Sequence, residues 1–262
     1  MIKMKSLKYY VEKIPDVLEL IDKNGISLPD LTGYSFFGSG NAYQVARMYA
    51  RYFDGYAHPS EDCEQLTKLD QVCVISASGG KDSIKVATKF KNSILLTCNP
   101  KAPASALSKK TIEIPALKEP PFYNVTTYAA MIYLLSRDKI NLPIIENNLI
   151  SWLSRSNIIF VTDKQNHPIA SMCALKVREI FGKLALSLTI EESYHGWFLH
   201  PLTEESVISI DVDFDLKDSY KVKGNTLEIL SKIYYHIGYL QEVLNIKEYD
   251  YDNIIKKRGW KL

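Results

Sequence analysis

The sequence predicts an α/β protein in which parallel sheets are flanked by helices. Short apolar segments of strand length alternate with longer segments in which apolar residues recur at helical spacing. Glycine and serine directly follow two of these short segments, as is usual where a strand turns into a helix. Strands that alternate with helices need crossover connections, and these produce a parallel sheet.

The first half of the chain starts with a helix and continues with strand and helix units. Apolar periodicity predicts a helix over residues 7–22, followed by Asn24-Gly25, a favourable helix C-terminus. The elements predicted next are a strand at 35–37, a helix at 42–53, a strand at 72–75, a helix at 82–90, strands at 93–97 and 111–114, and a helix at 124–135.

The second half looks like an abbreviated copy of the first. Beyond a proline-containing connection at Leu142-Pro143, the predicted elements are a helix ending near 154, a strand at 158–161, a long helix at 168–188, a strand at 207–212, and a helix at 227–244 before a basic tail. We therefore expect an N-terminal helical segment (1–30) and two α/β units (31–142 and 143–262) that share one site.

Composition indicates a globular protein whose partner is a small molecule. Of 262 residues, 46% are hydrophobic and 24% charged, and the net charge of +2 comes without a basic block that would suggest nucleic acid. The four cysteines lie far apart and no histidines have ligand spacing, so neither a disulfide framework nor a metal site is expected. Without an apolar signal core or a membrane-length apolar run, we expect a cytoplasmic protein that does not contact membranes.

Two turns after predicted strands are rich in glycine and serine. Gly38-Ser39-Gly40 follows the first strand, and Ser76-Ala77-Ser78-Gly79-Gly80 follows the second. Such turns present free backbone N–H groups at a helix N-terminus, and the hydroxyls of Ser39, Ser76 and Ser78 add hydrogen-bond donors. Turns of this composition also simply cap helices, but two at the same edge of an open sheet favour a phosphate site.

The second turn allows another interpretation. The run Ser78-Gly79-Gly80-Lys81-Asp82-Ser83 is similar to the loop that holds nucleotide phosphates in ATP pyrophosphatases. In that family the loop normally follows the first strand, whereas here a complete strand and helix unit precedes it. The loop by itself leaves both interpretations open.

A carboxylate and an imidazole in the second half suggest acid–base chemistry. Glu179 lies on a predicted helix, and His195 lies 195 − 179 = 16 positions later in a predicted turn at 194–196. A carboxylate can move a proton between adjacent carbons through an enediol, and an imidazole can open a sugar ring. The alternative is a solvated helix glutamate and an ordinary polar histidine.

Taken together, these motifs resemble the sugar isomerase (SIS) family, in particular tandem-SIS phosphosugar isomerases. This group includes the isomerase half of glucosamine-6-phosphate synthase and the archaeal phosphoglucose/phosphomannose isomerases. The matching segments are Gly38-Ser39-Gly40, Ile75-Ser76-Ala77-Ser78-Gly79, Cys98-Asn99 followed by Ser105-Ala106-Leu107, Ala174-Leu175-Lys176-Val177-Arg178-Glu179 and Glu192-Ser193-Tyr194-His195-Gly196. The resemblance implies two SIS units, each a flavodoxin-like three-layer sandwich, and a homodimer with shared active sites.

The resemblance also implies roles for single residues. Glu179 is expected to be the enediol base, His195 the ring-opening group, and Lys176 a group that stabilises charge or tunes the carboxylate. A C-terminal lysine should enter the site, either Lys256 or one of its neighbours Lys257 and Lys261. Residues expected to hold phosphate and substrate are Gly38, Ser39, Gly40, Ser76, Ser78, Lys81 and Ser83.

The sequence departs from the pattern of the SIS family in three respects, and these restrict the activity that is expected. Lys81 stands where the family usually has Thr or Ser, and the arginine typical of phosphoglucose/phosphomannose isomerases is not found near residues 120–124. No glutaminase domain precedes the SIS-like part, so ammonia-driven synthesis from glutamine is not expected.

The predicted function is cofactor-free aldose–ketose isomerisation of a sugar phosphate. A hexose 6-phosphate is the expected substrate, with glucose or mannose 6-phosphate converted to fructose 6-phosphate. The alternatives are an aminosugar-phosphate deaminase or deglycase, a non-catalytic phosphosugar sensor and, less favoured, an ATP pyrophosphatase-type enzyme.

Overall fold

The strands of the protein form two parallel sheets. The computed structural model describes residues 5–120, 122–141, 143–195, 205–212 and 219–246. The first sheet contains β1 (Ser35–Gly38), β2 (Tyr56–Pro59), β3 (Val72–Ile75), β4 (Ile94–Thr97) and β5 (Lys110–Glu113). The second contains β6 (Asn157–Thr162), β7 (Leu184–Thr189), β8 (Glu205–Ile210) and β9 (Ser219–Val222). Every strand pair in both sheets is parallel, which confirms the predicted arrangement.

The strand order creates a crevice at one edge of the first sheet. The order is β2-β1-β3-β4-β5, so the chain leaves β1 toward one side and β3 toward the other. The carboxyl ends of β1 and β3 therefore lie at the point where the order reverses, which is where open α/β sheets bind ligands. The second sheet has the order β7-β6-β8-β9 and repeats this arrangement with one strand fewer.

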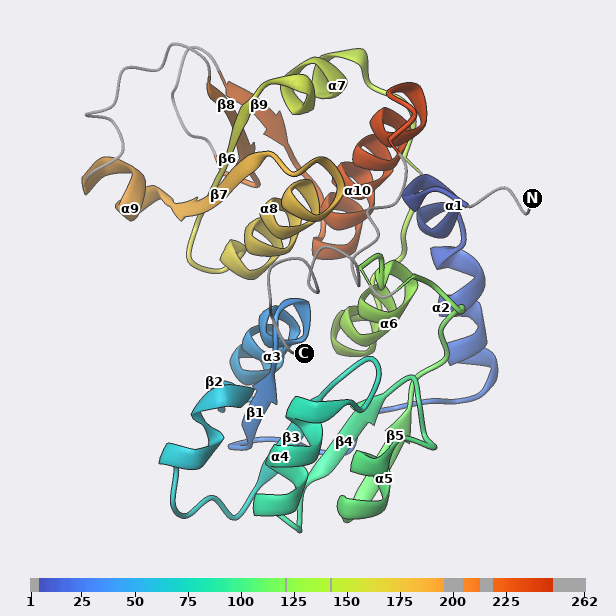
Figure 1. Ribbon diagram of the computed structural model, residues 1–262, viewed down its shortest axis with the longest axis vertical. Helices are drawn as coiled ribbons and strands as arrows, with labels where there is room; N and C mark the ends of the chain where they lie inside the picture. The colour runs from blue at the N-terminus through green and yellow to red at the C-terminus, as the bar shows by residue number, and fades with distance from the viewer. Residues whose placement is uncertain (1–4, 121, 142, 196–204, 213–218, 247–262) are drawn as a thin grey trace, which may run out of the picture.

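Helices cover the sheets. They are α1 (Leu7–Glu12), α2 (Ile14–Lys23), α3 (Asn41–Tyr52), α4 (Lys81–Lys89), α5 (Pro103–Leu107), α6 (Val125–Ser136), α7 (Asn147–Ser154), α8 (His167–Phe181), α9 (Ile190–His195), α10 (Thr226–Val243) and the short 3₁₀ helix η1 (Ser60–Gln65). Figure 1 shows α3, α6 and α8 between the two sheets, with α4 and α5 on the outer face of the first sheet. None of the helices in the described ranges is long and apolar enough to cross a membrane.

The main hydrophobic core lies between the sheets. It joins the inner faces of both sheets to the helices between them, and a smaller cluster around Phe37, Val86 and Phe90 seals α4 against the first sheet. Helix α6 is buried continuously from Val125 to Leu134. Its apolar residues are spread around the whole helix, as expected for a helix enclosed by others.

The first helix packs on the last one through a backbone contact. A Cβ atom at Gly238 would lie 2.2 Å from the Lys8 nitrogen, so α1 reaches α10 only because this position has no side chain. The Leu7 N–H donates to Gln241 Oε1 at 3.1 Å, and Gln241 Nε2 donates to the Tyr123 hydroxyl at 2.8 Å. These bonds attach the N-terminal segment to the second half of the chain.

Most predicted elements are confirmed within one or two residues. The strand at 72–75 and the helix end at 154 agree with β3 and α7. Three strands, β2, β7 and β9, were not predicted, and the helix predicted at 7–22 is divided into α1 and α2. Pro15 lies in the first turn of α2, where its missing N–H ends the hydrogen bonding of the preceding helix.

Two predictions for the second half of the chain are wrong. The helix predicted at 168–188 ends at Phe181, because Gly182 adopts a left-handed conformation with φ of 64° that terminates α8. The chain then forms β7, in which Leu184 and Leu186 alternate with residues that face the opposite way. His195 lies at the end of a short helix, α9, and not in the turn predicted at 194–196.

We expect Gly238→Ala to destabilise the protein by about 1–3 kcal/mol, because the new methyl group would push α1 away from α10. Urea unfolding of the variant and the wild type measures this difference. Val243→Ala, at an exposed position of the same helix, is the control and should change the free energy of unfolding by less than about 0.5 kcal/mol. Equal unfolding midpoints for Gly238→Ala and wild type would contradict the contact.

Candidate functional site

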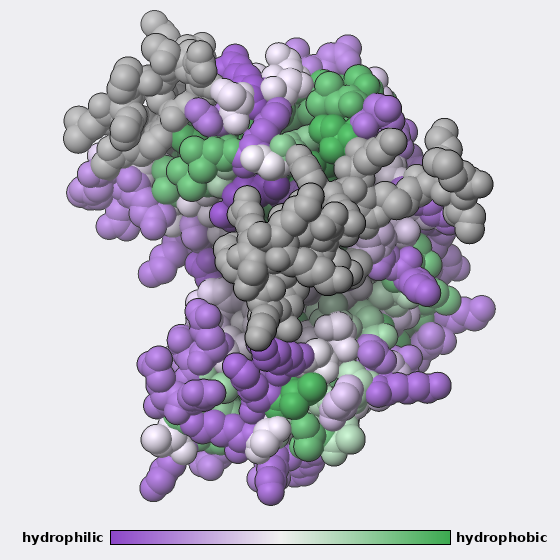
Figure 2. All heavy atoms as spheres, viewed as in Figure 1, coloured by the Kyte–Doolittle hydropathy of each residue, from purple (hydrophilic) through white to green (hydrophobic). Residues whose placement is uncertain are grey.

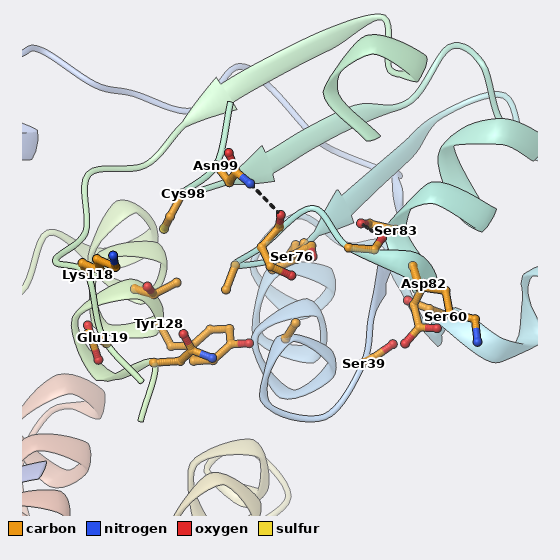
Figure 3. Close-up of a pocket in the computed structure, with 18 of the residues that line it drawn as sticks. Ser39, Ser60, Ser76, Asp82, Ser83, Cys98, Asn99, Lys118, Glu119 and Tyr128 are labelled. Carbon is orange, nitrogen blue, oxygen red and sulfur yellow. Dashed lines mark hydrogen bonds between the residues drawn. The ribbon is translucent and has the colours of Figure 1, made fainter. Parts of the chain in front are cut away.

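A cavity of about 740 Å³ opens at the carboxyl ends of β1, β3 and β4. Serine side chains from the strand-to-helix turns line one side of it, and the segment before α6 lines the other (Figure 3). The polar lining residues are Ser39, Ser60, Ser76, Ser78, Lys81, Asp82, Ser83, Asn99, Lys118, Glu119, Asn124, Thr127 and Tyr128. The structure thus brings Ser39, Ser76, Ser78, Lys81 and Ser83 together, all five of which were predicted to bind phosphate.

The turn after β3 is held rigidly by the end of β4. The Gly79 N–H donates to Ser76 Oγ at 3.1 Å, and Asn99 Nδ2 donates to the Ser78 carbonyl at 3.2 Å. Thr97 Oγ1 adds a bond to the Ala77 carbonyl at 3.1 Å. Since Ser76 Oγ accepts the Gly79 bond, its own proton remains available to a ligand.

Glycine is required at two places in these turns. Gly79 has a φ of 62°, and a Cβ there would lie 2.4 Å from the Ala102 Cβ. A Cβ at Gly38 would lie 2.4 Å from the Ala42 carbonyl oxygen, so α3 begins directly against the end of β1. Gly40, with a φ of 57°, then caps α3. Each glycine therefore allows a helix N-terminus to approach the cavity.

Helix α4 directs its N-terminus into the cavity. Gly80 is its cap, and Ile84 is the first residue whose N–H bonds back to the cap carbonyl. The main-chain N–H groups of Lys81, Asp82 and Ser83 therefore have no partner within the helix, the arrangement that binds anions. The Ser83 hydroxyl donates to the Gly80 carbonyl at 2.6 Å and fixes this first turn.

Helix α6 also begins at the cavity, but its N-terminus already holds an anion from the protein. The half-buried Glu119 carboxylate accepts bonds from the N–H groups of Val125 at 2.5 Å and Thr126 at 2.8 Å, and from the Thr126 hydroxyl. Burial raises the pKa of Glu119, and these hydrogen bonds oppose the rise. A phosphate group of a ligand can therefore bind the N-terminus of α4. The N-terminus of α6 is already occupied by the Glu119 carboxylate.

Lys176 and Glu179 form a pair behind the cavity wall. The ammonium group of Lys176 is fully buried and donates to Glu179 Oε2 at 2.6 Å, to the Tyr123 carbonyl at 2.9 Å, and to the Phe122 carbonyl. These three bonds use every N–H of the ammonium group. In the structure Lys176 therefore orients Glu179 and keeps no donor for a ligand.

Glu179 is close to the cavity without lining it. Its side chain is 23% exposed, so it is partly accessible to solvent. Burial, followed by the nearby Glu179 charge, raises the pKa of Tyr128, a residue of the cavity wall. The predicted base therefore acts electrostatically on a residue of the cavity wall.

The structure does not bring His195 to this cavity. His195 is exposed at the end of α9, which projects from β7 at the periphery of the molecule (Figure 1). Lys256, Lys257 and Lys261 lie outside the described residues. Within the described part of one chain, the serine turns line the cavity, the Lys176–Glu179 pair is attached to the segment before α6, and the predicted imidazole stays apart.

Several cavity residues were not predicted from the sequence. Asn99 follows the end of β4, and Lys118 and Glu119 follow β5, so their position after two further parallel strands was the available signal, whereas Tyr128 lies within α6. Cys98 also lines the cavity, but burial raises the pKa of its thiol to about 12, which keeps it protonated.

Neither a protein-family model nor a curated protein sequence matches the chain. Solved structures do match. The C-terminal domain of glucosamine-fructose-6-phosphate aminotransferase from Francisella tularensis has a TM-score of 0.69 at 12% identity, with 92% of this chain and 98% of that one covered. Glucosamine-6-phosphate deaminase from Thermotoga maritima has a TM-score of 0.65 at 14% identity, with 91% and 92% covered.

Tagatose-6-phosphate ketose/aldose isomerase from Escherichia coli also matches, with a TM-score of 0.58, 12% identity, and 92% and 90% coverage. The chain shares the fold of these proteins. The match runs through nearly the whole length of each chain and includes both sheets. At such identities the likeness establishes the fold, and the activity must be argued from the residues of the site.

We expect the double substitution Ser76→Ala and Ser78→Ala to weaken binding of glucose 6-phosphate and of inorganic phosphate by about 10-fold or more, because each hydroxyl can donate to a charged oxygen. Isothermal titration calorimetry measures both affinities. Ser154→Ala, at an exposed position of α7, is the control. A fall in ATP affinity with sugar-phosphate affinity unchanged would favour the ATP pyrophosphatase interpretation.

Proposed function

We propose that the chain is a sugar-phosphate isomerase of the SIS family that acts without a cofactor on a hexose 6-phosphate. The observation that carries the proposal is a cavity with an anion-binding turn on one side and, on the other, an α6 segment to which the Lys176–Glu179 pair is attached through the Phe122 and Tyr123 carbonyls. Ser39, Ser76, Ser78, Ser83 and the first turn of α4 would hold the phosphate. The shared fold with proteins named for sugar-phosphate chemistry supports the same substrate class.

In the proposed mechanism, Glu179 transfers a proton between the first two carbons of the open-chain sugar. The carboxylate takes the proton from C2, an enediolate forms, the proton returns to C1, and the O2 hydroxyl proton passes to O1, so that C2 becomes the carbonyl carbon. Lys176 holds the carboxylate in one orientation, so the same oxygen can serve both transfers. His195 would open the sugar ring, and Lys256 from the C-terminal segment would complete the site.

We further infer that the chain consists of two SIS units and acts as a dimer with shared sites. The common strand order of the two sheets supports two units, residues 31–142 and 143–262. The separation of His195 from Glu179 supports a site completed by a second copy. Among the described residues, strand β7 pairs on one side only and exposes Leu184 and Leu186, and Figure 2 shows hydrophobic side chains gathered at this part of the surface.

A panel of hexose and aminohexose phosphates, assayed for product without added cofactor, tests the activity. We expect turnover of a hexose 6-phosphate, and a loss of about 100-fold or more in kcat for Glu179→Gln, because the amide cannot accept a proton. Glu19→Gln, at an exposed carboxylate of α2, is the control and should retain wild-type turnover.

Each other outcome of the panel points to another function. Release of ammonia or an amine would indicate a deaminase or deglycase, and tight binding without turnover would indicate a sensor. Wild-type turnover by Glu179→Gln would show that another group is the base.

Mixing two inactive variants tests the shared site. If His195 acts across a dimer, Glu179→Gln and His195→Ala protein should recover activity together, because one site of each hybrid carries both native residues. Random exchange makes about half the dimers hybrid, so recovery should approach about a quarter of wild type. No recovery after demonstrated subunit exchange would place both residues in the same subunit's site.

A further inference from the structure

Tyr128 brings a buried hydroxyl group to the cavity from helix α6. Asn124, Thr127 and Tyr128 are spaced by three and four positions, so they lie on one face at the start of α6, and all three line the cavity. Only 7% of Tyr128 is exposed, and Figure 3 shows its ring extending from α6 into the space between this helix and the serine turns. The accessible end of the side chain therefore faces the cavity.

The Tyr128 hydroxyl has no hydrogen-bond partner among the described residues. Two other buried tyrosines do have partners. The Tyr49 hydroxyl donates to the Met131 carbonyl at 2.7 Å, and the Tyr234 hydroxyl donates to the Met172 carbonyl at 3.2 Å. A buried tyrosine hydroxyl usually finds such a partner, so a free one that faces a cavity points to a group of the ligand.

Other donors on the α6 side of the cavity are already used. The Glu119 carboxylate occupies the first N–H groups of α6, and the ammonium group of Lys176 has three partners within the protein. The Tyr128 hydroxyl is thus a buried donor on this side that no described protein group occupies. An isomerase needs such a donor, because enediolate formation places negative charge on a sugar oxygen.

We propose that Tyr128 is a further catalytic residue, whose hydroxyl donates a hydrogen bond to the sugar oxygen that becomes negatively charged in the enediolate. This rests on the proposed function, in which Glu179 takes the proton from C2. The electron pair of the broken C2–H bond forms the C1–C2 double bond, and the electron pair of the carbonyl bond moves onto O1. Tyr128 holds O1 by a hydrogen bond and keeps its own proton throughout.

The fold places Tyr128 on the side of the cavity where the reacting carbons are expected. If the serine turns hold a phosphate at C6, then C1 and C2 lie at the far end of the sugar, toward α6. Lys176 ties Glu179 to the Phe122 and Tyr123 carbonyls directly before α6, and Tyr128 is the fourth residue of that helix. The proposed base and the proposed donor are therefore both attached to this segment.

The surroundings keep Tyr128 protonated. Burial first, and then electrostatic interactions with Glu179, Cys98 and Glu119, raise the pKa of Tyr128 above its usual value. This direction suits a donor at an oxyanion, because a tyrosinate would have no proton to share. The contribution of Tyr128 to turnover should accordingly be the same at neutral and at mildly alkaline pH.

Tyr128→Phe tests the assignment, because it removes one oxygen atom and leaves the ring in place. With the substrate that the panel identifies, we expect kcat to fall about 100-fold at nearly unchanged KM, since the bond strengthens only as charge develops. Tyr133→Phe is the matched control. Its hydroxyl lies on the same helix and donates to Asp22 Oδ2 at 2.6 Å, and the variant should retain wild-type turnover. Unchanged kcat in Tyr128→Phe would overturn the proposal.

Binding of an enediolate mimic, 5-phosphoarabinonohydroxamate, provides a second measurement. Titration calorimetry should show that the wild type binds the mimic more tightly than glucose 6-phosphate. Tyr128→Phe should weaken binding of the mimic by about 10-fold or more and leave the affinity for inorganic phosphate unchanged. Urea unfolding should show no loss of stability in this variant, because its missing hydroxyl had no partner in the protein.

The two proposals fail in different ways. If the wild type prefers the mimic and Tyr128→Phe keeps that preference, Tyr128 is not the donor and the isomerase proposal is unaffected. If the wild type turns over no sugar phosphate and binds the mimic no more tightly than glucose 6-phosphate, the proposed function is wrong and this inference with it. Equal losses of affinity for the mimic and for inorganic phosphate would show a general disturbance of the cavity and would also overturn the assignment.

Discussion

One fully buried ammonium group organises the candidate site. Lys176 has no contact with solvent. Its ammonium group forms an ion pair with Glu179 and donates hydrogen bonds to the carbonyl oxygens of Phe122 and Tyr123. A buried charge that loses its partner is strongly destabilising, so these groups must stay together. The carbonyl groups belong to the segment that leads into α6, the helix whose first turns form the cavity wall. The wall and the predicted base are therefore fixed relative to each other.

The sequence predicted the parts of the site that lie in local motifs. The glycine and serine turns after β1 and β3 could be located because the same residues that bind an anion also determine the turn. Parallel pairing then placed both turns at one edge of the sheet, as predicted. Glu119 could not be found this way, because its role depends on the N-terminus of α6, and no local pattern places a carboxylate six residues before the helix that it caps.

The errors in the second half have a common physical origin. By hydrophobicity alone, Leu184 and Leu186 fit a helix as well as a strand. The left-handed conformation of Gly182 ends helix α8 before them, so they form strand β7. Because the predicted helix extended to 188, the position of His195 was also misjudged. The separation of His195 from Glu179 is a property of the tertiary arrangement, and the 16-residue interval between them carries no information about it.

The charges of the cavity argue for a compact anion. The lining includes two cations, Lys81 and Lys118, and two carboxylates, Asp82 and Glu119, so the side chains provide little net positive charge. An anion must then be bound mainly by hydroxyl groups and by the open N–H groups of α4, which converge on one point. A single phosphate group fits that convergence, and its two charges suit one helix N-terminus. A polyphosphate would have to extend along the wall toward the Glu119 carboxylate, where its further charges would be repelled.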